Sequence, residues 1–258
     1  MIPRLIPVLT LVDGHIYRTT NFSSPSYVGD PINAVRIFNE KGADELVIFD
    51  IGDSKFLHDT IKFKDISNIT SQAFMPTAYG GGVRNIDDVY KIFDAGFDKV
   101  ILGSTSIKNS SDFKFVSQVA SIFGSQSVSY TLDFIKSRFF GDRVRGFKSS
   151  FFKNIDILQF VNNLLDSGIG ELIVRDVSCD GKNNGANNNL IKLVSSNCNI
   201  PVIATGGIYT FEDVKSSLGA GAHSIASGNM FIYQGKRKAV LINYPNIKDR
   251  ISHYEDQE

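Results

Sequence analysis

The sequence predicts a single (β/α)8 barrel, and three observations support this expectation. The chain has 258 residues, of which 42% are hydrophobic, and a barrel of this class takes about 250 residues. Short apolar segments alternate with amphipathic helical ones along the whole chain. The second half of the chain also repeats the first. We therefore expect one domain that spans residues 1–258.

Eight segments rich in branched apolar residues are expected to be strands. They lie at residues 5–11, 45–50, 75–79, 99–102, 127–133, 171–176, 201–204 and 223–226. Helical spacing of apolar residues falls between them, for example at 32–40, 86–94 and 211–218. Strands that alternate with helices pack into a parallel sheet, because each helix carries the chain back to the starting edge.

The internal repeat predicts two half-barrels. Gly81-Gly82 recurs as Gly206-Gly207, an offset of 125. The segment from Glu45 to Asp50 recurs as 171–176, an offset of 126. Self-similarity at a fixed offset indicates a duplicated structural unit. We place the halves at about residues 1–123 and 124–245.

Composition excludes several classes of protein. Lys+Arg and Asp+Glu are both 27, so the chain lacks the basic excess of a nucleic-acid-binding protein. No apolar run reaches the roughly 18 residues of a membrane helix, and the chain starts directly into a strand without a signal peptide. Cys179 and Cys198 lack metal or redox spacing. We expect a cytoplasmic protein without metal, cofactor, nucleic-acid or membrane partner.

Glycine-rich turns after four of the strands predict two phosphate sites. Glycine lets the backbone approach an anion, and a helix that follows directs N–H groups at it. The hydroxyls of Ser104, Thr105 and Ser227 are further candidate donors. Tight turns that bind no ligand are the alternative. The candidate binding residues are Gly81, Gly82, Gly103, Ser104, Gly206, Gly207, Ser227 and Gly228.

Several motifs give the chain a resemblance to a known family. They are Arg4-Leu5-Ile6-Pro7, Gly42-Ala43-Asp44-Glu45-Leu46, Gly80-Gly81-Gly82-Val83-Arg84 and Ile200-Pro201-Val202-Ile203-Ala204. With them the chain resembles the cyclase subunit of imidazole glycerol phosphate synthase over nearly its whole length. The resemblance implies a glutaminase (HisH-like) partner at the N-terminal face of the barrel, which sends ammonia through the barrel to a phosphorylated or nucleotide-linked substrate.

Two further stretches, at residues 27–40 and 230–245, resemble one branch of that family. The branch belongs to bacterial surface-polysaccharide pathways. There the two subunits are implicated in turning an acetamido sugar into an acetamidino sugar. The second stretch follows the last predicted phosphate turn.

The resemblance also implies catalytic residues, and one of them is altered. The family uses two aspartates at the ends of strands 1 and 5 for acid/base chemistry. Asp133 keeps the second, but Thr10 stands at the first, and threonine cannot act as a general base. Asp50 and Asp176 end strands 2 and 6 and are expected to line the site, with turn capping as the alternative.

Other positions near the predicted site match the family only in part. Arg18 stands where the family has a lysine, near a loop that closes over the ligand. Asp180 and Gly181 match the family after strand 6, whereas Ser178 replaces an aspartate. These differences predict a different ligand or weaker activity.

A ring of four charges is expected at the opposite face. The family closes its ammonia entrance there, and the matching residues are Arg4, Glu45, Lys99 and Glu171. Each begins a predicted strand. Ion pairs that only join neighbouring strands are the alternative.

Four functions follow from these observations. The first is a synthase subunit of a glutamine amidotransferase complex that converts an acetamido sugar into an acetamidino sugar. The second is the cyclase subunit of imidazole glycerol phosphate synthase in histidine biosynthesis. The third is a non-catalytic barrel that activates the glutaminase. A sugar-phosphate isomerase is a distant fourth, because it has no use for the four charges.

Overall fold

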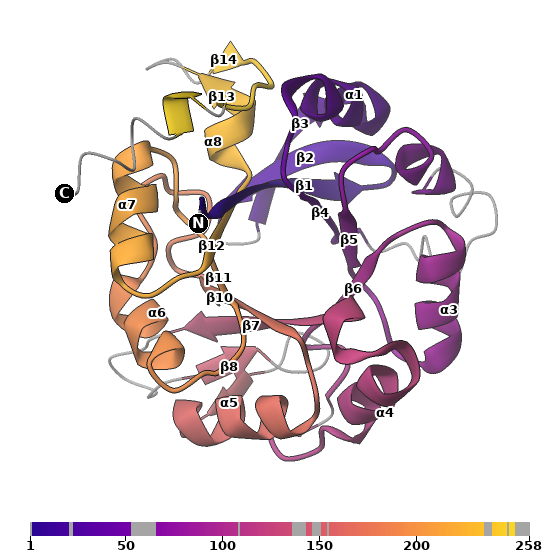
Figure 1. The fold of residues 1–258 in the computed structure, drawn as a ribbon, viewed down its shortest axis with the longest axis vertical. Helices are drawn as coiled ribbons and strands as arrows, with labels where there is room; N and C mark the ends of the chain where they lie inside the picture. Colours follow the sequence, from indigo (N-terminus) through magenta and orange to yellow (C-terminus); the bar gives the residue numbers. More distant parts are fainter. Residues whose placement is uncertain are drawn as a thin grey trace.

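Eight parallel strands close into a barrel with helices on the outside (Figure 1). The computed structural model describes residues 2–20, 23–52, 66–107, 109–135, 143–145, 151–153, 155–234, 239–246 and 248–250. The barrel strands are β1 (Arg4–Val12), β4 (Leu46–Asp50), β5 (Thr77–Gly80), β6 (Lys99–Leu102), β7 (Val128–Ile135), β10 (Glu171–Asp176), β11 (Val202–Thr205) and β12 (Ser224–Ser227). Pairing of β7 with β10 and of β12 with β1 completes the ring. The predicted fold class is confirmed, and each predicted strand overlaps an observed one.

In the described part of the chain, six longer α-helices and one short 3-10 helix lie between the barrel strands in the outer layer. They are α1 (Pro31–Lys41), α3 (Ile86–Asp94), α4 (Lys114–Phe123), η2 (Ser125–Ser127), α5 (Ile157–Asp166), α6 (Asn188–Ser195) and α7 (Phe211–Gly219). Local signals explain where they begin and end. The side chain of Asp30 caps α1, and Gly42 ends it at a φ of +68°. Thr210 and Asp213 form a reciprocal capping box at α7.

The alternation of side chains divides the core into two layers. One set of strand residues packs against the helices. The other set points into the barrel and forms an apolar lumen, because successive side chains on a strand face opposite sides. The apolar residues of the lumen are Ile6, Val8, Val47, Phe49, Ala78, Ile101, Ile173, Ile203 and Ala226, and β7 adds the uncharged Thr131.

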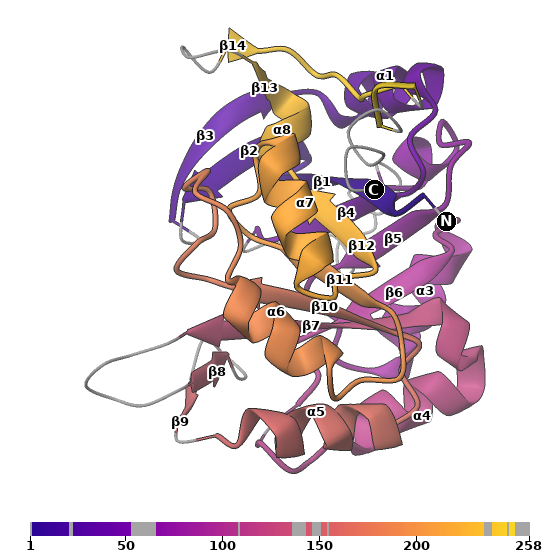
Figure 2. The same cartoon turned by 60° about the vertical axis from the view of Figure 1, so that its left-hand side comes forward.

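Two hairpins extend from the same end of the barrel (Figure 2). The first is β2 (His15–Thr20) with β3 (Ser23–Gly29), and β2 pairs with β1. The second is β8 (Arg143–Arg145) with β9 (Phe151–Lys153), and β8 pairs with β7. We expected a loop near Arg18, and the first hairpin corrects this expectation, because Arg18 lies on β2. The two hairpins follow the first strand of each half and preserve the repeat.

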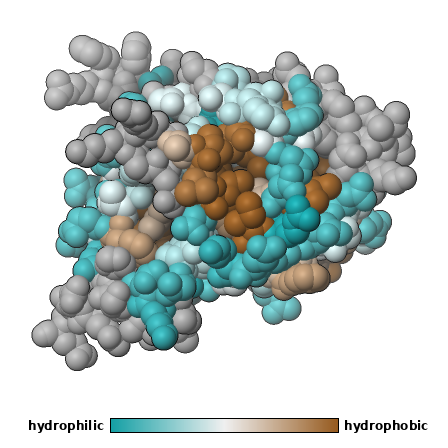
Figure 3. All heavy atoms as spheres, turned by 90° about the horizontal axis from the view of Figure 1, so that it is seen from above, coloured by the Kyte–Doolittle hydropathy of each residue, from teal (hydrophilic) through white to brown (hydrophobic). Residues whose placement is uncertain are grey.

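The chain ends with a segment that returns along the outside of the barrel. It contains α8 (Asn229–Ile232), β13 (Tyr233–Gln234) and β14 (Ala239–Val240). Val240 and Leu241 are about half exposed. Figure 3 shows a hydrophobic area on the side of the molecule where Figure 1 places α1, α8 and β14. Within the described residues, no helix is long and apolar enough to cross a membrane.

Candidate active site

A cavity of about 400 Å³ lies at the C-terminal ends of the barrel strands. This is the end where barrel enzymes of this class carry their active sites. Strand ends and the loops that follow them supply its walls. The cavity brings together fourteen of the residues predicted for catalysis and binding: Thr10, Arg18, Asp50, Gly81, Gly82, Gly103, Ser104, Asp133, Asp180, Gly181, Gly206, Gly207, Ser227 and Gly228.

Asp176 is not among the residues that line this cavity, contrary to our expectation. Its Oδ1 accepts hydrogen bonds from the amide and the hydroxyl of Ser178, at 2.8 and 2.6 Å. Its Oδ2 accepts one from Asn187 Nδ2 at 2.7 Å. The cause is strand alternation: Glu171, Ile173 and Arg175 point inward on β10, so the next side chain points outward. Asp176 therefore shapes the loop after β10.

Asp50 stands at the rim of the cavity. Its Oδ2 accepts a hydrogen bond from the hydroxyl of Tyr79 at 3.1 Å, and its Oδ1 accepts one from the amide of Gly52 at 3.1 Å. Burial, followed by the nearby Asp50 carboxylate, raises the pKa of Tyr79 well above its usual value, so this phenol stays a donor. Asp50 therefore lines the cavity, as expected, and also caps the turn after β4, which was the alternative.

Asp133 is paired with an arginine that the sequence analysis missed. Nε and Nη2 of Arg175 lie 2.8 and 2.7 Å from Oδ1 of Asp133. The hydroxyl of Thr131 also donates to this oxygen, at 3.3 Å. Burial alone would lower the pKa of Arg175, but the carboxylates of Asp133 and Asp180 raise it. The cation is therefore permanent, and Asp133 faces the cavity as half of an ion pair.

The position of Arg175 is constrained on further sides. Its guanidinium lies 5.2 Å above the centre of the Phe49 ring, at the upper end of the lumen. A Cβ added to Gly206 would lie 3.1 Å from Cγ of Arg175. Glycine thus lets the turn after β11 close against the arginine stem. The sequence could have identified Arg175, because it lies four positions after the inward-facing Glu171 and therefore on the same face of β10.

Thr10 and Arg18 occupy the opposite part of the mouth. Thr10 is 9% exposed, and its hydroxyl lies 3.5 Å from Nη1 of Arg18. Arg18 also donates to the carbonyl of Val8 at 3.1 Å and to Asn229 Oδ1 at 3.0 Å. Burial lowers the pKa of Arg18 from its ordinary value, while Asp180 acts in the other direction. Arg18 is therefore a half-buried residue of β2 in the cavity wall and not a solvated loop residue.

Gly228 lets the guanidinium of Arg18 lie directly against the backbone of the turn after β12. A Cβ at this position would fall within 2.1 Å of the guanidinium carbon and nitrogens. The turn after β12 thus has a cation directly beside its backbone. A cation next to a glycine turn suits a bound anion, since charge-assisted hydrogen bonds to phosphate are strong.

The loop after β10 joins the first hairpin and α8. A Cβ at Gly181 would lie 2.4 Å from the carbonyl oxygen of Thr19, so glycine permits this contact. Asn229 Nδ2 donates to Asn183 Oδ1 at 2.6 Å, and Asn183 has a φ of +58°. Burial raises the pKa of Asp180, against the effect of Arg175 and Arg18. Asn183 and Asn229 also line the cavity and were not predicted.

The two glycine-rich turns lie at equivalent places, but only part of the expected phosphate geometry is present. Gly82 and Gly207 have φ values of +65° and +85°, which favour glycine. The hydroxyls of Thr105 and Ser227 donate to the carbonyls of Val83 and Ile208, at 3.0 and 2.6 Å. These hydroxyl hydrogens therefore hold the turns together and are not directed at a ligand. After β6, residues 104–106 form a turn, and α4 begins only at Lys114, so the expected helix start is absent there.

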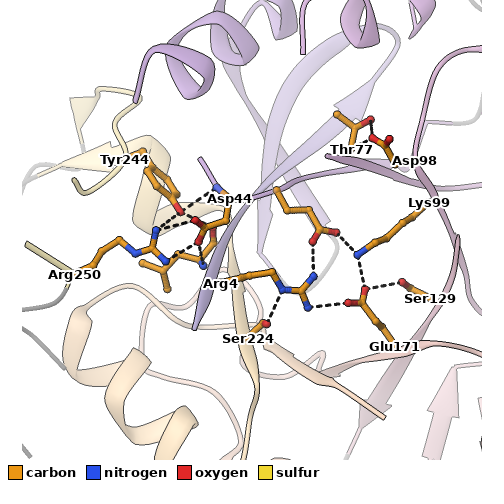
Figure 4. A network of polar contacts seen from close by, with 12 residues as sticks. Arg4, Asp44, Thr77, Asp98, Lys99, Ser129, Glu171, Ser224, Tyr244 and Arg250 are labelled. Carbon is orange, nitrogen blue, oxygen red and sulfur yellow. Dashed lines mark hydrogen bonds and ion pairs between the residues drawn. The ribbon is translucent and has the colours of Figure 1, made fainter. Parts of the chain in front are cut away.

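The four charges at the N-terminal face meet in a closed ring (Figure 4). Arg4 contacts Glu45 at 2.7 Å and Glu171 at 2.8 Å. Lys99 contacts Glu45 at 3.1 Å and Glu171 at 2.9 Å. Ser224 accepts from Arg4 Nε, and Ser129 donates to Glu171. The four side chains therefore meet at the N-terminal face, where the sequence analysis expected them.

The ring is electrostatically matched. Burial alone would raise the pKa of Glu171, but Lys99 and Arg4 lower it below its ordinary value. Burial opposes ionisation of Arg4 as well, and Glu171 and Glu45 raise its pKa. Glu171 therefore stays ionised, and the ring pairs two basic with two acidic side chains across the lower end of the lumen.

Comparisons with known proteins identify the family. The family described as "Histidine biosynthesis protein" matches residues 4–238. A Leptospira borgpetersenii protein, provisionally named imidazole glycerol phosphate synthase subunit HisF, is 37% identical over 96% of this chain and 97% of its own. A Pseudomonas aeruginosa protein, provisionally named as subunit hisF2, is 36% identical over 95% and 96%. The imidazole glycerol phosphate synthase subunit HisF of Wolinella succinogenes is 31% identical over 90% of both chains. The chain belongs to the histidine biosynthesis family of HisF-like barrels.

Proposed function

We propose that this chain is the ammonia-using synthase subunit of a glutamine amidotransferase complex. A glutaminase partner binds the N-terminal face and releases ammonia there. Ammonia passes through the lumen and reacts in the cavity with a phosphorylated or nucleotide-linked acceptor. The observation that carries the proposal is the closed ring of Arg4, Glu45, Lys99 and Glu171 below an apolar lumen that leads to the cavity.

The apolar lumen supports passage of the neutral molecule. Its nine apolar residues and Thr131 offer no charged side chain between the ring and Arg175. An ammonium ion would lose its hydration there at a cost of several kcal/mol or more, whereas neutral ammonia loses far less. An opening ring is needed for entry, because the four ion pairs span the lower end of the lumen.

The acceptor we favour is an acetamido sugar, which would become an acetamidino sugar in surface-polysaccharide synthesis. Two features of the cavity support a reaction other than imidazole formation. Thr10 offers no carboxylate opposite Asp133. Asp133 in turn is bound by the cation of Arg175, at 2.7 Å. A pair of carboxylates working as acid and base is thus replaced by one carboxylate with an arginine.

Imidazole glycerol phosphate synthesis is the second candidate. The names of the relatives favour it, since they all refer to this enzyme. The retained Asp133, Asp180 and glycine turns are compatible with a phosphate-bearing ligand in either reaction.

The experiment that tests the proposal mixes this chain with its glutaminase. One reaction receives glutamine and the cyclase substrate of histidine biosynthesis, and another receives glutamine and UDP-N-acetylglucosamine as a probe of acetamido chemistry. Products are followed by mass spectrometry. Imidazole glycerol phosphate would establish the second candidate. A product one mass unit lighter than the acetamido sugar, as expected when NH replaces O, would establish the first. Glutamine hydrolysis that is stimulated by the barrel, without a product from either acceptor, would support a non-catalytic activator.

A further inference from the structure

The C-terminal segment, at residues 239–246 and 248–250, makes a dense set of contacts beside the charge ring, and neither candidate reaction accounts for it. We call this segment the C-terminal strap. It packs against α8 and reaches the N-terminal face of the barrel. Leu241 and Asn243 donate from their amides to the carbonyls of Ile232 and Phe231, at 2.8 and 2.9 Å. The ring of Tyr244 stacks on Phe231 with centroids 5.4 Å apart.

Arg250 binds both chain segments that carry ring residues. Its Nη1 and Nη2 contact the two carboxylate oxygens of Asp44, at 3.0 and 2.6 Å. Its Nη2 also donates to the carbonyl of Pro3 at 2.7 Å. Asp44 directly precedes Glu45, and Pro3 directly precedes Arg4. A buried arginine that is 3% exposed thus holds the residues next to two of the four ring members.

Tyr244 completes the same network, which Figure 4 shows beside the ring. Its hydroxyl donates to the carbonyl of Leu5 at 2.9 Å and accepts from the amide of Asp44 at 3.3 Å and from Arg250 at 3.2 Å. Asp44 in turn accepts from the amide of Leu5 at 2.9 Å. The beginnings of β1 and β4 are therefore joined to each other and to the strap.

The other half of the ring has no such support among the described residues. Lys99 is preceded by Asp98, which accepts from the amide of Thr77 at 2.8 Å and so joins β5 to the start of β6. Among the described residues, Lys99 and Glu171 form hydrogen bonds with Glu45, Ser129 and each other, and not with the strap. The described part of the strap thus holds the Arg4 and Glu45 side of the ring, and its contacts do not extend to Lys99 or Glu171.

We propose that Tyr244 and Arg250 are positioning residues for the ammonia entrance, which keep Arg4 and Glu45 in the geometry that closes the ring. The consequence for function rests on the proposed use of glutamine-derived ammonia. A ring with a loosened Arg4 and Glu45 side loses ammonia to solvent before it enters the lumen. Free ammonium in the medium supplies the cavity without depending on a tight entrance.

Two variants of the full chain test the proposal. Tyr244→Phe removes one hydroxyl, and Arg250→Met removes the guanidinium while it keeps an apolar stem. Arg36→Met is the matched control, because Arg36 is exposed on α1 and donates a hydrogen bond to the neighbouring exposed Asn33. Hydrogen–deuterium exchange is measured by mass spectrometry on peptides that cover residues 2–8 and 43–47. We expect exchange there to rise at least tenfold in both strap variants and to be unchanged in the control and in peptides around residues 201–207.

The second measurement uses the complex with the glutaminase and compares synthesis from glutamine with synthesis from ammonium chloride. We expect glutamine-supported synthesis to fall about fivefold or more in Arg250→Met and ammonium-supported synthesis to stay at the wild-type rate. Unchanged exchange at residues 2–8 and 43–47 would overturn the proposal, as would an equal fall with both ammonia sources. If the wild-type complex uses neither source, the proposed function fails, and the exchange measurement alone decides whether the strap holds the ring.

Discussion

Removal of the Arg175 guanidinium gives the sharpest prediction for the cavity. Arg175→Met keeps an unbranched apolar stem over Phe49 but deletes the two donors at 2.8 and 2.7 Å from Asp133. The remaining carboxylate is 7% exposed. Removal of one partner from a buried ion pair costs about 3–5 kcal/mol, because the other charge stays desolvated. The cavity admits water and Thr131 still donates to Asp133, so we expect about 3 kcal/mol.

The assay is urea unfolding at pH 7, followed by circular dichroism, of the wild type, Arg175→Met, Asp133→Asn and the double variant. For a chain of this size the loss in Arg175→Met corresponds to a Tm lower by about 6–12 °C. The double variant should be more stable than the sum of the single effects by about 2 kcal/mol, since the two side chains touch. Strict additivity, or a loss below about 1 kcal/mol in Arg175→Met, would refute the reasoning. Arg36→Met serves as the surface control and should stay within about 0.5 kcal/mol.

Three further predictions concern the ring and the glycine turns. Lys99→Met should lower the free energy of unfolding by about 2 kcal/mol. This is less than the cost of a fully broken buried pair, because Arg4 still contacts both acids. Thermal unfolding of the variant, with Glu171→Gln in parallel, measures the loss, and an unchanged Tm in Lys99→Met would contradict the prediction. The lowered pKa of Glu171 predicts a stabilisation that is fully present above the ordinary glutamate pKa near 4.5 and is lost as the pH falls through the lowered pKa. The Tm difference between wild type and Glu171→Gln should therefore shrink below about pH 4.5. A constant difference down to pH 3 would count against this prediction. Gly207→Ala should cost about 3 kcal/mol of stability, since its Cβ would lie 2.3 Å from the carbonyl oxygen of Gly185 at a φ of +85°. Gly82→Ala meets open space at a φ of +65° and should cost about 1 kcal/mol. Equal losses in urea titrations of the two variants would show that the contact with Gly185 is not limiting.

The barrel strands were predictable because each is a short, mostly apolar segment between amphipathic helical ones, and four of them are followed by glycine-rich turns. The repeat fixed their number, since the glycine pairs at 81–82 and 206–207 recur with their strands. The hairpins were missed for a physical reason. The β2 sequence HIYRTT and the β8 sequence RVR are short and polar, and they pair at the mouth with the ends of β1 and β7. Tertiary pairing, and not local propensity, makes them strands.

The site was predictable wherever position along a strand decides which way a side chain points. The ring residues lie at the beginnings of their strands, with Glu45 directly before β4. Thr10 and Asp133 lie an even number of residues beyond Arg4 and Ser129, so they share the inward face. The same rule, applied from Glu171, selects Arg175 and rejects Asp176. Asp176 repeats Asp50 at the offset of 126, and this repeat led us to place it in the site. A shift of one residue, however, reverses the face of a strand on which a side chain lies. Contacts between loops, such as Asn229 with Asn183, have no sequence periodicity to reveal them.

The measurement that tests the central claim most directly follows the source of the nitrogen. The complex of this chain with its glutaminase receives glutamine labelled with ¹⁵N at the amide, a tenfold excess of unlabelled ammonium, and both acceptors named above. Mass spectrometry then gives the labelled fraction of the product. Passage through the closed ring and the lumen predicts that most of the product carries the label. A product whose label is diluted to the proportion in the medium would contradict the account, because the ammonia would have reached the cavity from solvent.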